Sequence, residues 1–395
     1  MDLFLLTLST IGLLVGLAIT YWIHSQYRME VVVRPSLSLS EINTNPPLVS
    51  VIVPARNEDR NIRRCILALL AQDYPNFEVI VVDDRSTDET PRILADLQRS
   101  SANAHQRLIV IQGDELPTGW AGKPYALTQG AAVARGDWLC FVDADTFAIP
   151  ELLSATYACA QSQRADLFTM LTDQELGSFW EKSILPLVFT ALSFGFPAAR
   201  VNDPQKPDAI ANGQFILIRA DVYHKLGGHE AVRGRIDEDK ALAELVKRAG
   251  HRLVIADGRL VARTRMYTSL PEIWEGWTKN IYLGLQDRLW LLLFGAVVGL
   301  LGALILPFWL LAGVVWLAAG GGIVAAIIAI QALIVWGYLI AERMRVSRGM
   351  GISPLFAFTL PLGTLLFTAM MFVSAYNVLS GKGVTWKGRV YSQSS

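Results

Sequence analysis

Long apolar runs lie near both ends of the chain, and a segment of mixed polarity lies between them. The first run extends from Leu3 to about Ile23, which is long enough to cross a membrane as a helix. A secretory leader would open on basic residues and close on small ones, whereas this segment begins Met1-Asp2 and closes on Tyr21-Trp22. We therefore expect residues 1–27 to be an uncleaved membrane anchor.

The other long apolar runs predict membrane helices within residues 289–380. Leu289–Ile340 is nearly free of charge, too long for one span and suited to two, with a turn near Gly320–Gly322. Pro354–Leu379 is a further apolar stretch that a proline and a glycine interrupt. It predicts either a fourth crossing or a broken or re-entrant helix.

Basic residues next to these runs predict which side of the membrane each loop occupies. Arg28 and Arg34 follow the first run, and three arginines lie between residues 343 and 348. The positive-inside rule then places the middle segment in the cytoplasm, which suggests an integral protein of the plasma (inner) membrane. Four crossings would leave the tail at residues 381–395 outside, but the tail's own basic residues favour the inside, and the sequence leaves both alternatives open.

The middle segment, from residue 48 to about 265, alternates between short β runs and helical periods. Buried-strand patterns occur at Val49–Val53, Glu78–Val82, Leu108–Ile111 and Trp138–Val142, with helical patterns at Asn61–Gln72, Thr90–Arg99 and Pro124–Ala134. This alternation predicts βαβ units and an α/β fold with a mostly parallel sheet. Because such sheets bind ligands at the carboxyl ends of their strands, residues directly after these runs are candidates for a site.

Composition and charge narrow the class of protein. Hydrophobic residues make up 52% of the 395 residues and charged residues 18%, which fits a polar domain flanked by membrane helices. The formal net charge is zero, so no broad attraction for nucleic acid is indicated. Cys65, Cys140 and Cys159 are odd in number and lack zinc spacing, which is typical of buried thiols in a reducing compartment.

Charged residues follow the first two strand patterns. Pro54, Arg56 and Glu58 lie in the loop after the first strand, and Asp83 and Asp84 lie after the second. Carboxylates at strand ends can accept hydrogen bonds from a nucleobase edge and from sugar hydroxyls. The alternative is structural, because the same residue types cap helices and build turns.

Asp143 and Asp145 follow the most apolar strand pattern and are two residues apart. They could bracket a hard divalent cation that substrate phosphates bind in part, or they could be solvated turn residues. Lys123 opens a helix, where anions are favoured, and could bind a diphosphate or lie on the surface.

Three acidic residues, Asp237, Glu238 and Asp239, open a helix that runs to about Lys247. The helix dipole alone favours acids in a first turn. The functional alternative makes Asp239 a general base, which an attacking hydroxyl requires.

Taken together, these residues resemble the family 2 glycosyltransferases, whose domain has the GT-A nucleotide-sugar-binding fold. The matching motifs, in the family's order, are Pro54–Glu58, Asp83–Asp84, Gly122–Lys123, Asp143–Asp145 and Glu238–Asp239, while Gly213–Phe215 resembles the family's acceptor-side segment. The resemblance covers about residues 48–265. It implies inverting transfer from a nucleotide diphosphate sugar, most often a UDP-sugar, with Mg²⁺ or Mn²⁺ as cofactor.

The resemblance also implies roles for individual residues. Glu58, Asp83 and Asp84 would hold the nucleoside, and Pro54 and Arg56 belong to the same motif. Asp143 and Asp145 would bind the metal ion, with Asp145 favoured as the direct ligand. The base would be Asp239, with Glu238 beside it, while Gly213 and Gln214 would lie on the substrate side.

The flanking helices resemble those of hopanoid-associated and carotenoid glycosyltransferases and, more distantly, ceramide glucosyltransferase. That resemblance implies a hydrophobic lipid acceptor. Processive synthases of the family carry Gln-x-x-Arg-Trp after the base, and residues 277–290 lack that spacing, which disfavours polymerisation. A polyprenyl-phosphate sugar synthase is the alternative, although its phosphate acceptor would need no base. Residues 266–288 are expected to form an interfacial helix region.

An uncharged run from Ile184 to Ala199 lies between the metal and base motifs. It cannot cross the membrane, because Asp145 and Asp239 must lie on the same side. It predicts either a buried core helix or a helix lying in the bilayer interface, whose phenylalanines would line a route for the lipid. These are Phe189, Phe194 and Phe196.

Overall fold

The computed structural model describes residues 2–26, 29–35, 45–100, 107–284, 289–380, 384–386 and 389–391. The chain divides into two compact units. The α/β unit comprises Met29–Glu175 and Ala198–Met266, and the helical unit comprises Met1–Arg28, Leu176–Pro197 and Tyr267–Ser395. Arg28, from which the orientation was partly predicted, and most of the basic tail lie outside the described residues.

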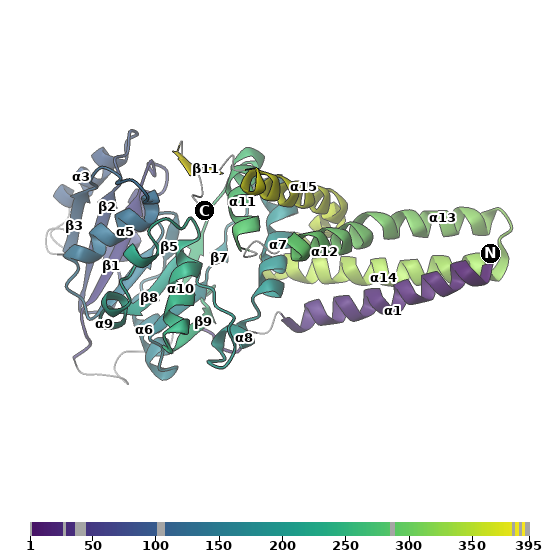
Figure 1. Ribbon diagram of the computed structural model, residues 1–395, viewed down its shortest axis with the longest axis horizontal. Coiled ribbons are helices and arrows are strands. Elements are labelled where there is room, and N and C mark those ends of the chain that lie inside the picture. The colour runs from purple at the N-terminus through teal and green to yellow at the C-terminus, as the bar shows by residue number, and fades with distance from the viewer. Residues whose placement is uncertain are drawn as a thin grey trace. The chain divides into compact units, whose positions relative to one another are not determined.

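A seven-stranded sheet forms the centre of the α/β unit (Figure 1). Its strands, in spatial order, are β3 (Leu108–Gln112), β2 (Phe77–Asp83), β1 (Val49–Ala55), β4 (Trp138–Val142), β8 (Phe215–Arg219), β6 (Leu167–Leu171) and β9 (Leu253–Asp257). Strand β8 runs antiparallel to its neighbours β4 and β6, and the other neighbouring pairs are parallel. The expected mostly parallel α/β fold is confirmed, with β8 as a reversal that the polarity pattern does not reveal.

The central strands are buried on both faces, as their unbroken apolar runs require. The helices of the unit are α2 (Ile62–Leu70), α3 (Thr90–Ser100), α5 (Gly122–Val133), α6 (Leu152–Ser162), α8 (Ala198–Asn202), α9 (Ala220–Lys225) and α10 (Glu238–Arg248). Helix α5 lies so close to β1 that a Cβ at Gly130 would come within 2.5 Å of Ile52 Cγ2. This close packing fixes the start of α5 near the edge of the sheet where β4 ends.

A three-stranded sheet extends this edge. It consists of β5 (Thr146–Ala148), β10 (Ala262–Thr264) and β7 (Asp173–Gln174), in that order. The Asp143–Asp145 turn joins β4 to β5, and Thr146 N donates to the Asp143 carbonyl over 3.0 Å. The two aspartates are therefore held in a short turn between two sheets.

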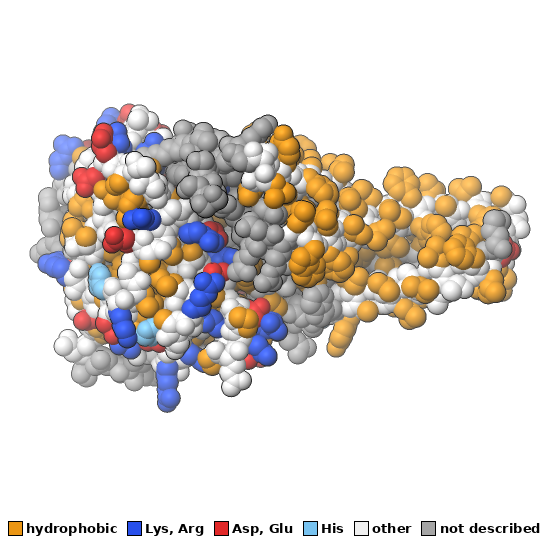
Figure 2. All heavy atoms as spheres, viewed as in Figure 1, with side chains coloured by type: hydrophobic (Ala, Val, Ile, Leu, Met, Phe, Trp, Pro, Cys, Tyr) orange, Lys and Arg blue, Asp and Glu red, His pale blue; other side chains and the backbone are white. Residues whose placement is uncertain are grey.

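Among the described residues of the helical unit, four helical segments are long and apolar enough to cross a membrane. They are α1 (Asp2–Gln26), α12 (Leu289–Leu300) continued through a π-helical turn into α13 (Leu306–Ala318), α14 (Gly322–Gly349), and a 3₁₀ turn at Pro354–Thr359 continued into α15 (Leu360–Leu379). The predicted turn near Gly320 is confirmed. Hydrophobic side chains cover this unit in Figure 2, whereas charged side chains gather over the α/β unit.

Contacts of α15 show where it lies along its neighbours within the helical unit. Leu360, in its first turn, packs in one cluster with Ala303 and Ile340, which are interior positions of the two preceding spans. Near its other end, Ala375 packs with Leu292, close to the start of α12. Helix α15 therefore begins partway along these spans and returns toward the end where α12 begins, as a re-entrant helix would.

The uncharged run between the metal and base motifs forms α7 (Phe179–Gly195), which belongs to the helical unit. Arg343 Nη2 of α14 donates to the Lys182 carbonyl over 2.7 Å, and a Cβ at Gly363 of α15 would come within 2.5 Å of the Ser183 carbonyl. Helix α7 thus packs on α14 and α15, so it is not a helix of the α/β core. Helix α11 (Leu270–Gly284) packs beside α15 in the same unit (Figure 1).

Candidate active site

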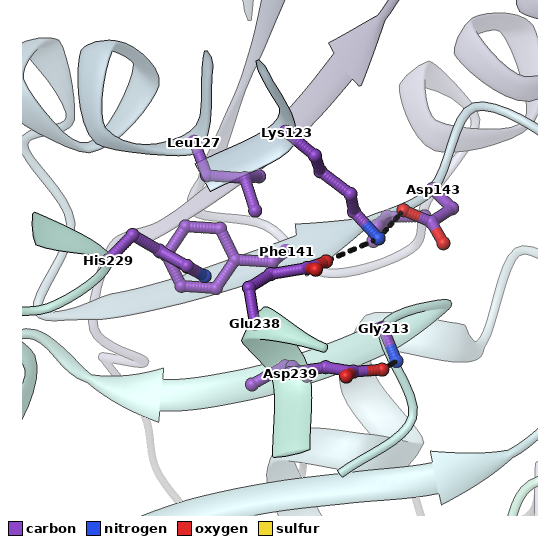
Figure 3. A pocket seen from close by; sticks show the side chains of 10 residues that line it. Lys123, Leu127, Phe141, Asp143, Gly213, His229, Glu238 and Asp239 are labelled. Carbon is purple, nitrogen blue, oxygen red and sulfur yellow. Dashed lines mark hydrogen bonds and ion pairs between the residues drawn. The ribbon is translucent and has the colours of Figure 1, made fainter. Parts of the chain in front are cut away.

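Side chains from several segments meet in a small pocket of the α/β unit where β4 ends (Figure 3). Its lining includes Lys123 at the start of α5, Asp143 after β4, Gly213 before β8, and Glu238 and Asp239 at the start of α10. Lys123 Nζ lies 2.7 Å from Asp143 Oδ1 and 3.0 Å from Glu238 Oε1. One ammonium group therefore connects the Asp-x-Asp turn with the first turn of α10.

The charge of Lys123 is held by its neighbours. Burial by itself would lower the pKa of Lys123, but attraction by Asp143, Glu238 and Asp239 outweighs burial and raises this pKa well above its ordinary value. The side chain is 34% exposed, so it can still be reached from solvent. Lys123 is therefore a permanent cation at the mouth of the pocket.

Asp239 is held by two backbone amides. Gly213 N donates to its Oδ2 over 2.9 Å, and Lys240 N donates to its Oδ1 over 2.7 Å. Burial and the negative charge of Glu238 raise the pKa of Asp239 to about 7, against the opposing effects of Lys123 and the two amides. A carboxylate with a pKa close to neutral can take a proton from a substrate and release it again.

Glu238 differs from Asp239 in its surroundings. Its residue is 5% exposed, and its Oε1 is paired with Lys123. Of the two carboxylates expected to be catalytic, Asp239 has the features of a base, while Glu238 fixes Lys123 and raises the pKa of its neighbour.

The Asp-x-Asp turn has the chemistry of a hard-cation site. The described residues contain no group of three or more His, Cys, Asp or Glu side chains placed to hold a metal on their own. Burial raises the pKa of the Cys65 thiol, and the negative charges of Asp145, Glu58 and Asp143 raise it further, so these carboxylates concentrate charge around one point. Proteins commonly bind Mg²⁺ through one or two carboxylates, and substrate phosphates complete the coordination of the ion. The residues of this turn therefore fit such an ion.

The loops after β1 and β2 form a second cluster, which is not part of the pocket lining. Arg56 Nη1 donates to the Asp84 carbonyl over 2.7 Å, and Asp83 Oδ1 accepts from Ser86 N over 3.0 Å. Asp83 is 2% exposed and Asp84 is 7% exposed. Both aspartates thus help to build their own turn, which is what the structural alternative predicts. Nucleoside binding stays a prediction for Pro54, Arg56, Glu58, Asp83 and Asp84.

Gln214 is placed differently from its neighbour Gly213, because it lies outside the pocket lining. Its Oε1 accepts from Thr172 Oγ1, from Asn212 Nδ2 at 3.2 Å and from Gln174 Nε2 at 3.3 Å, and the residue is 3% exposed. A buried hydrogen-bond network of this kind fixes the Asn212–Gln214 segment. Gln214 therefore orients the Gly213 amide, which donates to Asp239.

His229 lines the pocket although the sequence pattern did not single it out. It follows Gly227 and Gly228, which have φ values of 79° and 51°. A Cβ at Gly228 would overlap the Tyr223 ring, so this turn needs glycine. In the sequence, only the glycine pair draws attention to this position. A glycine pair predicts a turn, and it does not predict a binding or catalytic role for the histidine.

Comparisons with known proteins agree with this geometry. Residues 50–227 match the family described as Glycosyl transferase family 2. A 4,4'-diaponeurosporenoate glycosyltransferase from Staphylococcus aureus is 26% identical over 278 residues, which cover 68% of this chain and 72% of that protein.

Among solved structures, a mannosyltransferase from Pyrobaculum calidifontis in complex with GDP-Man and Mn²⁺ aligns over 96% of this chain and 99% of its own. The TM-score is 0.52 and the sequence identity is 16%, so this likeness shows a shared fold.

Proposed function

Because this chain is a glycosyltransferase with a family 2 domain, we propose that it transfers a sugar from a nucleotide diphosphate sugar to a membrane lipid, with inversion at the anomeric carbon. A UDP-sugar is the expected donor, and a carotenoid or hopanoid-type alcohol is the expected acceptor. The observation that carries the proposal is the Lys123 bridge between Asp143 and Glu238. It brings the expected metal-binding turn and the expected base into one pocket.

Each residue of the pocket would have its own role in such a transfer. Asp143 and Asp145 would hold Mg²⁺ or Mn²⁺, which neutralises charge on a leaving diphosphate. Lys123 contacts Asp143 of the same turn and would bind the diphosphate on the side away from the metal ion. Asp239 would take the proton of the attacking hydroxyl, because its raised pKa suits it to accept one near neutral pH.

A lipid acceptor is supported by the helical unit. The part of the chain that the structure describes has four segments suited to a membrane, and α7 packs among them. A helix in the bilayer interface keeps its apolar side chains in the headgroup boundary. We propose that α7 lies there and that the lipid tail stays in the membrane beside it while its polar end enters the α/β unit, on the cytoplasmic side of the plasma (inner) membrane.

A second candidate acceptor is a carotenoid carboxylate, because the name of the Staphylococcus aureus relative specifies 4,4'-diaponeurosporenoate. A carboxylic acid is already ionised near neutral pH and needs no base to attack the sugar. A polyprenyl phosphate shares this property. The Asp239→Asn variant separates these candidates, since it should lose transfer to an alcohol and retain transfer to an acid or a phosphate.

The proposal is tested with membranes that contain the full chain and with radiolabelled UDP-glucose, UDP-N-acetylglucosamine or GDP-mannose. We expect label in an organic extract, in a product that resists mild acid. No product should form with Asp145→Asn or in EDTA, and added Mg²⁺ or Mn²⁺ should restore the EDTA-treated enzyme. Full activity in EDTA would contradict the metal assignment, an acid-labile lipid would indicate a polyprenyl phosphate sugar, and aqueous polymer would indicate a processive synthase.

A further inference from the structure

His229 is a buried polar residue of the pocket that the proposed reaction has not used. It is 1% exposed, and its ring packs edge-on against Phe141 with 4.8 Å between ring centroids. In Figure 3 it lies beside Phe141, on the side of the pocket away from Asp143. Its Nδ1 is 2.8 Å from the Tyr223 hydroxyl, whereas the described residues provide no hydrogen-bond partner for Nε2.

Two contacts hold the Tyr223 hydroxyl against His229. His229 N donates to the Tyr223 oxygen over 3.1 Å, and Nδ1 of the ring lies 2.8 Å from the same oxygen. The hydroxyl can donate to Nδ1 or accept from it. In both cases Nδ1 is occupied by Tyr223, and Nε2 is the ring nitrogen that a ligand can reach.

The ring is neutral because burial, and then the positive charge of Lys123, lower the pKa of His229 to about 3. A neutral imidazole has one donor nitrogen and one acceptor nitrogen, so Nε2 takes the role that Nδ1 does not take toward Tyr223. A hydroxyl group can both donate and accept, so it can pair with Nε2 in either tautomer.

We propose that His229 is a specificity-determining residue whose Nε2 forms a hydrogen bond with one hydroxyl of the transferred sugar. The inference rests on the proposed function. The sugar must lie between the diphosphate side, marked by Asp143 and Lys123, and the base Asp239, and His229 lines the same pocket. The pocket has room for a group about the size of one water molecule, which suits a single hydroxyl better than a whole ring.

Two amide variants separate the role of Nε2 from that of Nδ1. The His229→Asn side chain is short and can keep the contact with Tyr223, but it cannot reach the position of Nε2. The His229→Gln side chain is longer and can place its amide group, which offers both a donor and an acceptor, near that position. Both variants are made in the full chain and purified in detergent with a total membrane lipid extract as acceptor.

The measurement is kcat/KM for the donor that the wild type uses best among UDP-glucose, UDP-N-acetylglucosamine and GDP-mannose, and for its monodeoxy analogues. The wild type should discriminate against one analogue by at least about tenfold, as expected for a lost hydrogen bond in a buried site. His229→Asn should reduce that ratio to near one by losing rate only with the parent donor. His229→Gln should recover part of the ratio.

The inference is overturned if folded His229→Asn keeps the wild-type ratio for every analogue, or if the Asn and Gln variants lose it equally. Tyr223→Phe, which removes the partner of Nδ1 and leaves Nε2 in the pocket, should keep most of the ratio. A loss as large as that of His229→Asn would indicate a purely structural role for the ring. If the wild type uses none of the donors, the proposed function fails instead, which is a separate result.

Discussion

Asp239 is subject to opposing electrostatic effects within one pocket. Burial and Glu238 disfavour its ionised form, while Lys123 and the amides of Lys240 and Gly213 favour it. The result is a pKa of about 7, well above the ordinary value for an aspartate. The charged form that can accept a proton is therefore populated only as the pH rises through neutrality.

The first prediction concerns this base. With an alcohol acceptor, the wild-type rate should rise with pH through about 7 and level off above it, because only deprotonated Asp239 can act. Asp239→Asn should lower the rate about 10²–10⁴-fold and remove this pH-dependent limb, while donor binding persists. Steady-state rates between pH 5 and 9, with calorimetric donor binding as the control, measure both effects. If the rate of the variant still rises with pH as the wild-type rate does, the titrating group is not Asp239.

At the scale of elements, the backbone approaches the site closely at Gly213. A Cβ there would lie 2.9 Å from Lys123 Nζ and 3.1 Å from Asp239 Oδ2, tighter than ordinary contacts. Gly234 offers a matched control in the same unit, because a Cβ there would meet only the Gly119 carbonyl, at 3.4 Å. Neither glycine has a positive φ.

The second prediction follows from that difference. Gly213→Ala should displace the Lys123 ammonium or the Asp239 carboxylate by a few tenths of an ångström and lower the transfer rate by at least about tenfold, because catalysis is sensitive to small misplacements. Gly234→Ala should leave the rate within about twofold. Transfer assays and thermal unfolding of both variants check this. Equal rates for the two variants would mean that the Gly213 segment has room to adjust.

The third prediction concerns α7, whose C-terminal half is less buried than its first half. If the lipid passes beside it, Phe194→Asp should weaken transfer to the lipid and leave hydrolysis of the donor largely unchanged, because the pocket belongs to the α/β unit. Val188→Asp, at a position 1% exposed, should instead unfold the helical unit and reduce protein yield, because it buries an unpaired carboxylate.

An exposed position in the α/β unit gives the control for α7. Leu260 is 59% exposed, so Leu260→Asp should change neither activity. Transfer, donor hydrolysis and yield are measured on all three variants. If Phe194→Asp lowers transfer and hydrolysis together at normal yield, α7 acts on the α/β unit rather than on the lipid.

The polarity pattern located those elements whose burial is periodic or continuous. The strands up to β4, their helices and α10 lie within a few residues of their predicted bounds, because each buries a run that the period of its backbone makes visible. The direction of β8 was not visible, because a buried strand reads alike in either orientation. His229 was also missed, since only the folded chain shows that this histidine lines the pocket and contacts Tyr223.

At the scale of the whole molecule, length and apolarity leave open whether one segment crosses the membrane, and its packing bears on this question. The segment from Pro354 to Leu379 is as long as a span, and length and apolarity alone make it one. Its contacts with Ala303 and Ile340 at one end and Leu292 at the other fit a segment that enters partway and returns. Hydropathy cannot distinguish these cases, because a re-entrant helix buried among other helices is equally apolar.

The last prediction tests this topology with single cysteines and a membrane-impermeant thiol reagent applied to sealed vesicles of known orientation. Ser353→Cys and Leu379→Cys flank the segment at exposed positions, and Ala319→Cys marks the exposed turn between α13 and α14. In a topology where α14 crosses the membrane and α15 returns, the first two should be labelled from one side and Ala319→Cys from the other. The native cysteines are buried, so the wild type should label little. Labelling of Leu379→Cys from the side of Ala319→Cys would show that the segment crosses, and α15 would then be a fourth span.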